Sequence, residues 1–427
     1  MFPVSFKLIT LAARRGLPSL VLALSVGQSQ AQTPRPLSLD EALGIAQANA
    51  PALNAAARGA VAAREMAVAN GQLPDPVLRL GVDNLPTGGP DQWSLTRDFM
   101  TMRRIGVMQE YVPADKRQLL RRRAELEAVR MEAGQRGLLA NLRRDVAVAW
   151  FDRVFAQRSR VLLDTLEAEF DLQLKTLDSQ VRAGKATPSE VPMAKAALLQ
   201  THDRRLVVDK QEQTARIVLA RWLGADAERE LGVAPDIERP PWRPDNPRAV
   251  DMVPAVLEHA SERELVQADL AIAEATKRPN WTWEVTYSQR GSVYSNMLSF
   301  GVSIPLTFNA SNRQDREIAA RQAQVAQAHA QHEDVVRETR AAMAGAYAEW
   351  NSLVDRQRRL SDALLPIARQ RIDLAMAAYR SGQSNLGAVL EARRAEVEAQ
   401  LQLLDLQRET ARVWAQLQYT YTQGVEP

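Results

Sequence analysis

The chain has 427 residues, a net charge of +3 and no cysteine, which excludes disulfides, thiolate metal sites and thiol catalysis. Charged residues make up 25% of it, with only 20 glycines and 22 prolines, which excludes a disordered or low-complexity chain. The arginine runs lie in helical stretches among acidic residues. That pattern favours solvated helix faces over a nucleic-acid site.

Residues 1–31 have the pattern of a cleaved secretory signal peptide. Basic residues precede a short apolar stretch at Leu17–Val26, and small residues follow at Ser29-Gln30-Ala31. The mature chain is therefore expected to start at Gln32. No later segment has the ~18 consecutive apolar residues of a membrane-spanning helix. We expect an exported protein that is either periplasmic or a β-barrel component.

The remainder of the chain repeats itself. Val181-Arg182-Ala183-Gly184 recurs as Tyr379-Arg380-Ser381-Gly382, at an offset of 198 residues (382 − 184). Two further dipeptide motifs recur at offsets of 195 and 197 residues: Gly106-Val107 with Gly301-Val302, and Ala149-Trp150 with Ala346-Tyr347. Nearly constant offsets indicate a duplicated structural unit. We predict a first repeat at 32–230, a proline-rich connector at 231–254 and a second repeat at 255–427.

Each repeat contains two short segments in which apolar and polar residues alternate. The strands are expected at about 77–83 and 105–112 in the first repeat, and at about 281–289 and 297–306 in the second. The clearest apolar face consists of Trp281, Trp283, Val285, Tyr287, Leu298, Phe300 and Val302. Strands of about ten residues with one apolar, aromatic-flanked face are typical of outer-membrane barrels. These seven residues are therefore expected to face lipid.

Four strands are too few to close a barrel. Open sheet edges are not tolerated in hydrocarbon, so sister subunits must complete the wall. Two copies would give a filled interior, whereas three copies would supply twelve strands and leave a passage. The predicted fold is mainly α with a small β part. Duplicated long-helix hairpins form an α-barrel, and four strands per protomer join a trimeric 12-stranded transmembrane β-barrel.

The helical part is dominated by two very long stretches. No proline occurs between Pro113 and Pro188, which predicts one helix over 115–181, ~100 Å long at 1.5 Å per residue. The second stretch is expected from about 312 to 380, with a kink at Pro366.

Each long helix is expected to end at a repeated glycine, Gly184 or Gly382, in the left-handed conformation that ends many helices. Return helices follow at 189–222 and 386–422. Their expected N-caps are Thr187 and Asn385, with Pro188 at the first helical position of one copy. The two turns are expected to form the far tip of a helical conduit.

The sequence offers no enzymatic chemistry. His329 and His332 have a spacing of three residues, but no acidic or sulfur partner shares their helix face. Met100, Met102 and Met108 lie near the first hairpin's loop, where thioether groups could contact soft metals. Ordinary packing is the favoured interpretation of these methionines. No phosphate loop, catalytic triad or zinc motif occurs. The protein is expected to be no enzyme and to have no cofactor and no metal site.

Several motifs occur in a specific order: Leu39-Asp40-Glu41-Ala42-Leu43, Leu73-Pro74-Asp75-Pro76, Val181–Gly184 with Glu190-Val191, and Tyr379–Gly382 with Val389-Leu390-Glu391-Ala392-Arg393. By this order, spacing and duplication the chain resembles the TolC-type outer-membrane efflux proteins over essentially its whole mature length. The resemblance implies a trimeric β-barrel in the outer membrane lipid and a helical barrel in the periplasm. It also implies that the helical tips bind a periplasmic membrane-fusion adaptor linked to an inner-membrane RND-type pump.

The expected function is therefore a passive exit duct of a tripartite efflux system. Leu73–Pro76 and Asn84-Leu85-Pro86 resemble the heavy-metal-efflux branch, so the expected cargo is heavy-metal cations or small toxic compounds. Multidrug or solvent efflux and type I secretion are alternatives. A soluble periplasmic coiled-coil scaffold is a rival from a different class.

The resemblance places the gate and the adaptor contact at the tip, on Arg182, Gly184, Thr187, Glu190, Tyr379, Arg380, Gly382, Asn385 and Glu391. Family members have carboxylates six and nine residues after the second glycine. Here these positions are Ala388 and Glu391, so one acid ring is retained, and Gly387 replaces an apolar residue.

Two interpretations of Glu391 are open. Three copies near an axis would attract cations, or the side chain faces solvent or pairs with Arg393 or Arg394. Tyr379 and Arg380 are expected to bond neighbouring helices and hold the tip closed.

Overall fold

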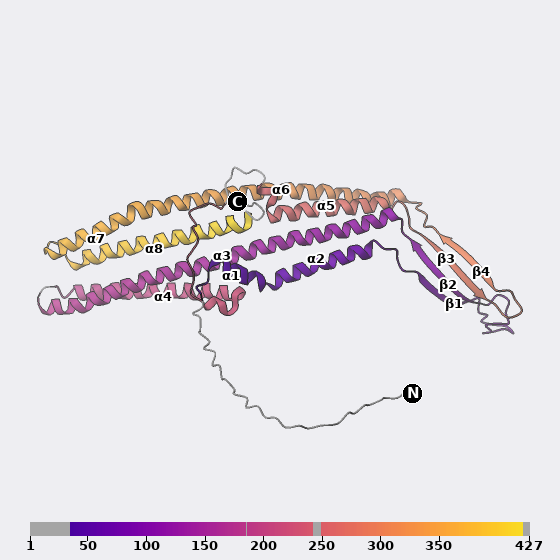
Figure 1. Cartoon of the computed structure of the whole chain (residues 1–427), viewed down its shortest axis with the longest axis horizontal. Helices are drawn as coiled ribbons and strands as arrows, with labels where there is room; N and C mark the ends of the chain where they lie inside the picture. The colour runs from indigo at the N-terminus through magenta and orange to yellow at the C-terminus, as the bar shows by residue number, and fades with distance from the viewer. Residues whose placement is uncertain (1–34, 185, 242–248, 422–427) are drawn as a thin grey trace, which may run out of the picture. The chain divides into compact units, whose positions relative to one another are not determined.

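The computed structural model describes residues 35–184, 186–241 and 249–421. The chain divides into two units, Met1–Arg35 and Pro36–Pro427. The expected signal peptide lies outside the described residues, as do residues 242–248 of the expected connector. Within the second unit, long helices run side by side and a small sheet lies at one end of them (Figure 1).

Each repeat consists of a helical segment, two strands and a helical hairpin. The first repeat contains α1 (Leu39–Ala48), α2 (Pro51–Asn70), β1 (Val77–Asp83), β2 (Met102–Tyr111), α3 (Ala114–Arg182) and α4 (Glu190–Leu223). The second contains α5 (Pro254–Ala275), β3 (Trp281–Gln289), β4 (Met297–Ser303), α6 (Gln314–Arg359), α7 (Leu365–Arg380) and α8 (Leu386–Gln416). The predicted duplicated order of elements is confirmed.

The two long helical stretches differ in one respect. α3 is a single helix of 69 residues that begins directly after Pro113. In the second repeat, a five-residue π-helix at Leu360–Leu364 joins α6 to α7. Pro366 lies in the first turn of α7, where it has no N–H to donate to the preceding turn. The irregularity expected at Pro366 therefore takes the form of a π segment, a common way for a helix to absorb such a break.

The four strands form one antiparallel sheet in the order β1-β2-β3-β4. The pairing of β2 with β3, which places Gly106 opposite Thr286, joins the hairpins of the two repeats. β2 begins at Met102 rather than near residue 105, because its first residues pair with the end of β1. β4 ends at Ser303 rather than 306, since Pro305 has no N–H to continue the ladder.

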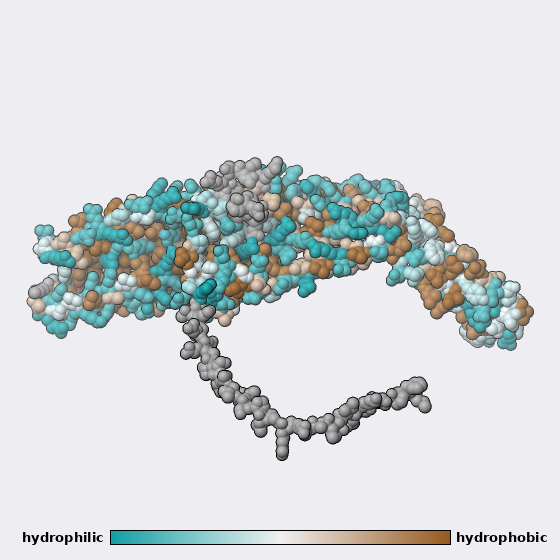
Figure 2. Space-filling view, viewed as in Figure 1, coloured by the Kyte–Doolittle hydropathy of each residue, from teal (hydrophilic) through white to brown (hydrophobic). Residues whose placement is uncertain are grey.

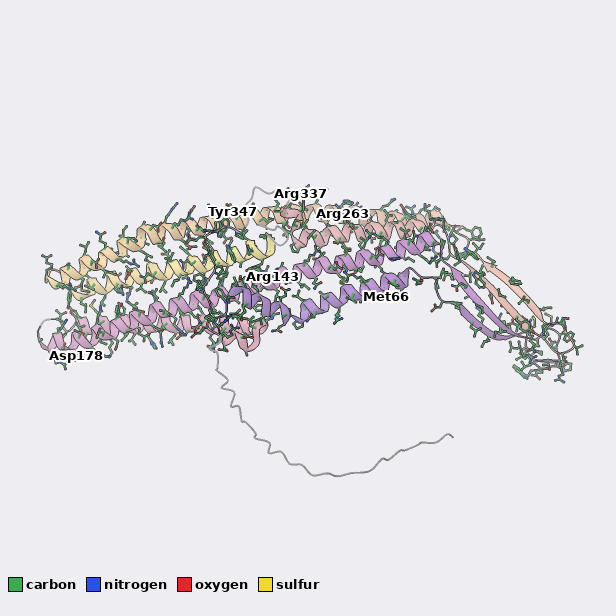
Figure 3. The ribbon with its side chains drawn as sticks, viewed as in Figure 1. Met66, Arg143, Asp178, Arg263, Arg337 and Tyr347 are labelled. Carbon is green, nitrogen blue, oxygen red and sulfur yellow. The ribbon has the colours of Figure 1, made fainter. Side chains whose placement is uncertain are left out.

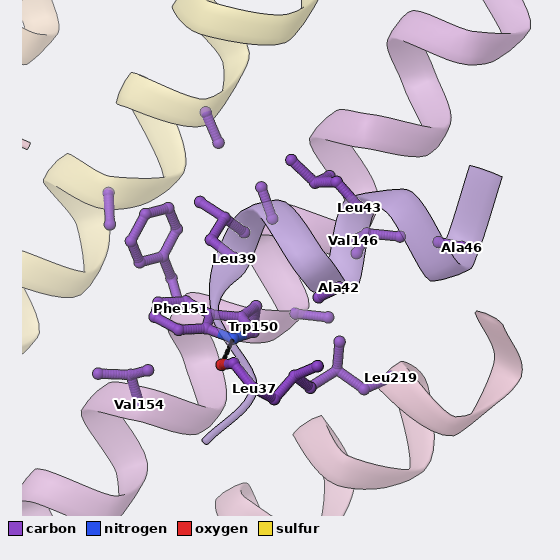
Figure 4. Packing of buried hydrophobic residues seen from close by; sticks show 14 of the residues in the cluster. Leu37, Leu39, Ala42, Leu43, Ala46, Val146, Trp150, Phe151, Val154 and Leu219 are labelled. Carbon is purple, nitrogen blue, oxygen red and sulfur yellow. Dashed lines mark hydrogen bonds between the residues drawn. The ribbon is translucent and has the colours of Figure 1, made fainter. Parts of the chain in front are cut away.

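The largest buried cluster lies where α1, α3, α4 and α8 meet, and Figure 4 shows its packing around Trp150 and Phe151. The Trp150 indole Nε1 donates to the Leu37 carbonyl oxygen at 3.2 Å (Figure 4). Trp350 repeats this contact, donating to the Ile237 carbonyl oxygen at 3.0 Å. Both contacts span 113 residues, so Trp350, and not Tyr347, is the counterpart of Trp150. The repeat offset at this level is therefore 200 residues (350 − 150).

The described part of the connector runs along the helices and is fixed by backbone contacts. Leu37 and Leu231 form a parallel bridge, and the Gly232 N–H donates to the Leu37 carbonyl at 2.9 Å. Farther along, the Trp414 indole donates to the Arg239 carbonyl at 3.1 Å. These contacts join the connector to Leu37 of the first repeat and to Trp414 of the second.

Candidate functional site: the two-faced sheet and the helical turns

One face of the sheet is apolar and uncovered. All seven residues expected to face lipid lie on this face: Trp281, Trp283, Val285, Tyr287, Leu298, Phe300 and Val302. β1 and β2 extend the face with Leu78, Leu80, Ile105 and Val107. Phe300 is 76% exposed and Leu80 is 69% exposed. Apolar residues dominate the visible surface of the sheet (Figure 2), so a large apolar surface has no cover within one chain.

The opposite face is polar and more sheltered. Thr286 and Ser288 are only 9% and 7% exposed. Arg79 Nη1 contacts Glu284 Oε2 at 3.2 Å, and Arg104 Nη1 lies 3.3 Å from the Asp83 carboxylate. A one-sided sheet in a water-soluble protein buries its apolar face and solvates the polar one. Here the arrangement is reversed, as in a barrel that has lipid outside and water inside.

The sheet also has two open edges. In the strand order β1-β2-β3-β4, no strand of the described chain pairs with the outer side of β1 or of β4. Each edge therefore presents unpaired backbone N–H and C=O groups. Lipid offers these groups no hydrogen bonds, so an apolar sheet of this kind requires a partner strand at each edge.

Both helical hairpins turn at the end of the helices away from the sheet (Figure 1). Gly184 has φ +69° and Gly382 has φ +74°, the left-handed conformation expected of both. Asn385 caps α8, because its side chain accepts from the Ala388 N–H. Thr187 was expected to cap α4, but the N-cap position of this helix is Ser189 and no side chain caps it. The Glu190 N–H donates to the Thr187 backbone carbonyl instead, so Pro188 lies in the turn before the helix.

The two turns lie next to each other. The Tyr379 hydroxyl donates to Gln180 Oε1 of α3 at 3.3 Å, which links the two hairpins as expected for this tyrosine. A Cβ on Gly387 would lie 2.8 Å from the Met193 methyl group, so the glycine allows α4 and α8 to approach closely. Arg380 is exposed and bonds to no other residue of the described chain.

Arg182 is also exposed, and among the described residues it pairs only with Asp178 of its own helix, at 2.7 Å; Figure 3 labels Asp178. This i, i+4 contact lies at the surface of α3. It therefore contributes little to holding the two hairpins together.

The two acidic residues expected at the tip have different surroundings. Glu391 is exposed. It does not pair with Arg393 or Arg394, which contact Glu169 and Gln200 instead. Glu190 is only 7% exposed, because it shares the inward face of α4 with Ala194 and Ala197. Its Oε2 atom has no hydrogen-bond partner. Of the two acids, only Glu391 is accessible on the surface of the chain.

An ionic cluster that sequence reasoning missed lies beside the tip. Arg393 of α8 bonds both oxygens of Glu169 on α3, at 2.6 and 2.9 Å, and also contacts Glu396. Glu396 is 5% exposed and lies 3.4 Å from Arg369 of α7. The hydrogen bond that Arg393 donates to Glu169 is the largest cause that raises the pKa of Arg393. The cluster connects the two repeats, and only the i, i+3 spacing of Arg393 and Glu396 hinted at it.

Three of the four histidines, His259, His329 and His332, lie on α5 and α6, which pack on each other. Burial is the largest cause that lowers the pKa of His332. The positive charges of Arg263, His259 and His329 lower this pKa further, whereas the negative charge of Asp251 raises it. Figure 3 labels Arg263. The His332 Nδ1 atom is buried without a hydrogen-bond partner. In the described ranges, no three His, Asp or Glu side chains are arranged to hold a metal.

This histidine predicts a pH dependence of stability. The folded state holds the pKa of His332 below its ordinary value of 6.5. Above that pH both states are neutral there, whereas below it the unfolded chain takes up the proton first, so stability falls. His332→Gln is expected to reduce the fall in Tm between about pH 7.5 and 5.5. Equal pH slopes for wild type and His332→Gln would contradict the assignment.

No helix among the described residues combines the length and apolar character needed to cross a membrane.

Comparison with known proteins agrees with this geometry. Residues 248–420 match the model of a family described as outer membrane efflux protein. No curated protein sequence matches the chain.

Three solved structures share the fold. A membrane protein from Pseudomonas aeruginosa has 19% identity and a TM-score of 0.75, covering 91% of this chain and 92% of that one. The open state of the Neisseria gonorrhoeae MtrE outer membrane channel has 15% identity and a TM-score of 0.74, covering 90% and 88%. CusC, whose structures are described in terms of folding and transmembrane channel formation, has 15% identity and a TM-score of 0.73, covering 95% and 98%. The chain is thus similar to the outer membrane efflux proteins in sequence over residues 248–420, and it shares the fold of these solved structures over both repeats.

Proposed function

We propose that the protein is the outer-membrane channel of a tripartite efflux system and acts as a passive exit duct. The observation that supports this most strongly is the exposed apolar face of a sheet with two open edges. Such a face is stable in lipid and unfavourable in water, while its edges require strands from other subunits.

Three copies would satisfy both requirements. If β4 of one copy pairs with β1 of the next, the contact is heterologous and closes into a ring by threefold rotation. The ring has twelve strands, enough to enclose a passage. The polar face, with Arg79, Arg104 and Glu284, then lines the lumen.

The other parts of the proposal rest on the similarity to the outer membrane efflux proteins. The chain is exported by a signal peptide cleaved after Ala31, the sheet lies in the outer membrane, and the helices extend into the periplasm. The turns at Gly184 and Gly382 contact a periplasmic membrane-fusion adaptor, which connects them to an inner-membrane RND-type pump. That pump supplies the energy, so the duct needs neither a cofactor nor catalysis.

The cargo that we propose is heavy-metal cations or other small toxic compounds. The resemblance of Leu73–Pro76 and Asn84-Leu85-Pro86 to the heavy-metal-efflux branch supports this choice. Multidrug or solvent efflux and type I secretion use ducts of the same architecture and are the alternatives. Deletion of the gene, followed by growth tests on metal salts, on detergents and on solvents, separates these classes.

The full-length protein provides the direct test of the duct. It is expected to stay in membranes after carbonate extraction, to run as a heat-sensitive trimer on denaturing gels, and to conduct ions in planar bilayers. A soluble periplasmic scaffold would wash off in carbonate, and it leaves the exposed Phe300 and Leu80 face unexplained. Recovery as a water-soluble monomer without detergent would refute the proposal.

The hydrogen bond between Tyr379 and Gln180 gives a test of the tip. Tyr379→Phe removes it, at about 1 kcal/mol per protomer, so the open population and the bilayer conductance are expected to rise several-fold. Ser381→Ala is the control, because the Ser381 hydroxyl bonds only within its own helix, to the Ala378 carbonyl. Equal conductance of Tyr379→Phe and wild type would exclude this gate.

Exposed Glu391 gives a second test at the tip. If its three copies line the entrance, Glu391→Gln is expected to lower the preference for cations in reversal-potential measurements, because like charges near an axis attract cations. An unchanged potential would mean that Glu391 faces the bulk solvent.

A further inference from the structure

Two glycines make room on the polar face of the sheet. A Cβ on Gly106 would lie 2.5 Å from Thr286 Oγ1, too close for any side chain at this position. A Cβ on Gly81 would lie 3.0 Å from Arg104 Nε. The space that a side chain would fill is therefore taken by Thr286 and Arg104, which lie along the wall of the sheet.

Because Gly106 has no side chain, a series of contacts can cross three strands at this position. Arg79 of β1 is directly opposite Gly106 of β2, which is directly opposite Thr286 of β3. The Thr286 hydroxyl donates to Glu284 Oε1 at 3.0 Å, and Arg79 Nη1 donates to Glu284 Oε2 at 3.2 Å. The Arg79 side chain thus crosses β2 over the glycine and ends on a carboxylate that the threonine holds in place.

Because Gly81 has no side chain, the Arg104 side chain can lie over it and form a second ion pair. Arg104 is directly opposite Gly81, and its Nη1 lies 3.3 Å from the Asp83 carboxylate on the same strand as the glycine. The side chains of Arg104 and Asp83 are 37% and 35% exposed. Both arginine–carboxylate pairs are therefore open to water and to any ion that passes along this face.

We infer that these two pairs determine the ionic selectivity of the barrel lumen and keep its bore open. The inference rests on the proposed function, since only a closed barrel has a lumen. Paired charges largely cancel each other's field at a distance, so cargo of either sign meets a weak field. Because the side chains lie along the wall, they neutralise each other without narrowing the passage.

One acid on the polar face is left over. Glu110 pairs with no arginine of the described ranges, and its Oε1 accepts from the Asn280 amide at 2.7 Å. The polar face of the strands therefore carries two arginines, Arg79 and Arg104, against three carboxylates, Asp83, Glu110 and Glu284. The barrel is expected to prefer cations weakly.

The test is to remove either partner of the Arg79–Glu284 pair. The ionic selectivity of each variant is then obtained from reversal potentials of the full-length trimer across a KCl gradient in planar bilayers. Glu284→Gln leaves Arg79 unpaired in three copies, so selectivity is expected to move toward Cl⁻. Arg79→Gln leaves Glu284 unpaired, so it is expected to move toward K⁺. Each change in the permeability ratio is expected to be about two-fold at ~0.1 M salt, where screening reduces the field. Arg103→Gln is the control, because Arg103 lies opposite Val82 on the other face.

The glycines are tested by a matched pair of variants. Gly106→Ala displaces Thr286 and Glu284 from the wall, and a loss of single-channel conductance is expected. Gly301→Ala is the control, since a Cβ there meets nothing closer than Glu284 Cβ at 3.9 Å. If Gly106→Ala does not assemble, Thr286→Val removes the hydroxyl without adding atoms and is expected to shift selectivity toward K⁺, because Glu284 is freed from its donor.

The outcomes separate this inference from the proposed function. A wild-type protein that never conducts refutes the duct, and with it any role in a lumen. A conducting wild type refutes only the inference if Glu284→Gln and Arg79→Gln leave the reversal potential unchanged or shift it in the same direction. Shifts of opposite sign, with Arg103→Gln unchanged, support it.

Discussion

Replacing Phe300 with arginine is expected to leave little of the protein in the outer membrane. Phe300 is 76% exposed on the apolar face of β4, directly opposite Val285. An arginine on the lipid face near the bilayer midplane costs about 2–4 kcal/mol. The proposed trimer would carry three such residues, so the total of roughly 6–12 kcal/mol rivals the whole stability of an ordinary domain. The measurement is the fraction of protein that resists carbonate extraction and runs as a heat-sensitive oligomer.

Ser299→Arg is the matched control for this prediction. Ser299 precedes Phe300 on the same strand and lies opposite Thr286, on the polar face. In a barrel this arginine faces water, so assembly close to that of the wild type is expected. Equal assembly of Phe300→Arg and Ser299→Arg would show that the two faces meet the same solvent, and the membrane assignment of the sheet would be wrong.

Replacing Arg393 with methionine is expected to destabilise the helical hairpins. The variant loses both hydrogen bonds to Glu169 and leaves Glu396, which is 5% exposed, without its nearest cation. Removing one partner of a buried ion pair costs about 3–5 kcal/mol. Arg369 at 3.4 Å and Gln400 at 3.0 Å still contact Glu396. The remaining loss is about 2 kcal/mol, expected as a fall in Tm of several degrees in detergent.

The neighbouring arginine offers the control. Arg394 follows Arg393 on α8, but its one hydrogen bond within the described ranges goes to the exposed amide of Gln200. Arg394→Met is therefore expected to change stability by less than about 0.5 kcal/mol. If Arg393→Met melts at the wild-type temperature, the cluster does not hold the two repeats together.

Local features of the sequence were sufficient to predict the bounds of several helices and strands. The alternation at 281–289 predicted β3 with its observed bounds, because a period of two residues assigns both the strand and its two faces. The proline-free stretch after Pro113 predicted α3 to within one residue at each end. Gly184 and Gly382 have the expected positive φ, and Asn385 is the expected cap. In each case the information lies within a few residues.

Other predictions failed where distant segments meet. The sequence alone does not indicate that packing of α4 buries the side chain of Glu190. Tyr347 was aligned with Trp150, whereas the indole contacts show that Trp350 is the counterpart. The period of two residues gave the faces of each strand, but nothing in it indicated that β2 pairs with β3.

The sequence by itself determined that this protein has duplicated long helical hairpins and strands with one apolar face, because periodicity and chain breakers act locally. Only the tertiary structure decided that the four strands form one sheet, that Arg393 joins the repeats through Glu169, and that Thr286 lies over Gly106. These contacts depend on which of many chemically equivalent side chains are brought within a few ångströms. That choice is made by the packing of the whole chain, since the energy of each contact alone is too small to select its partner.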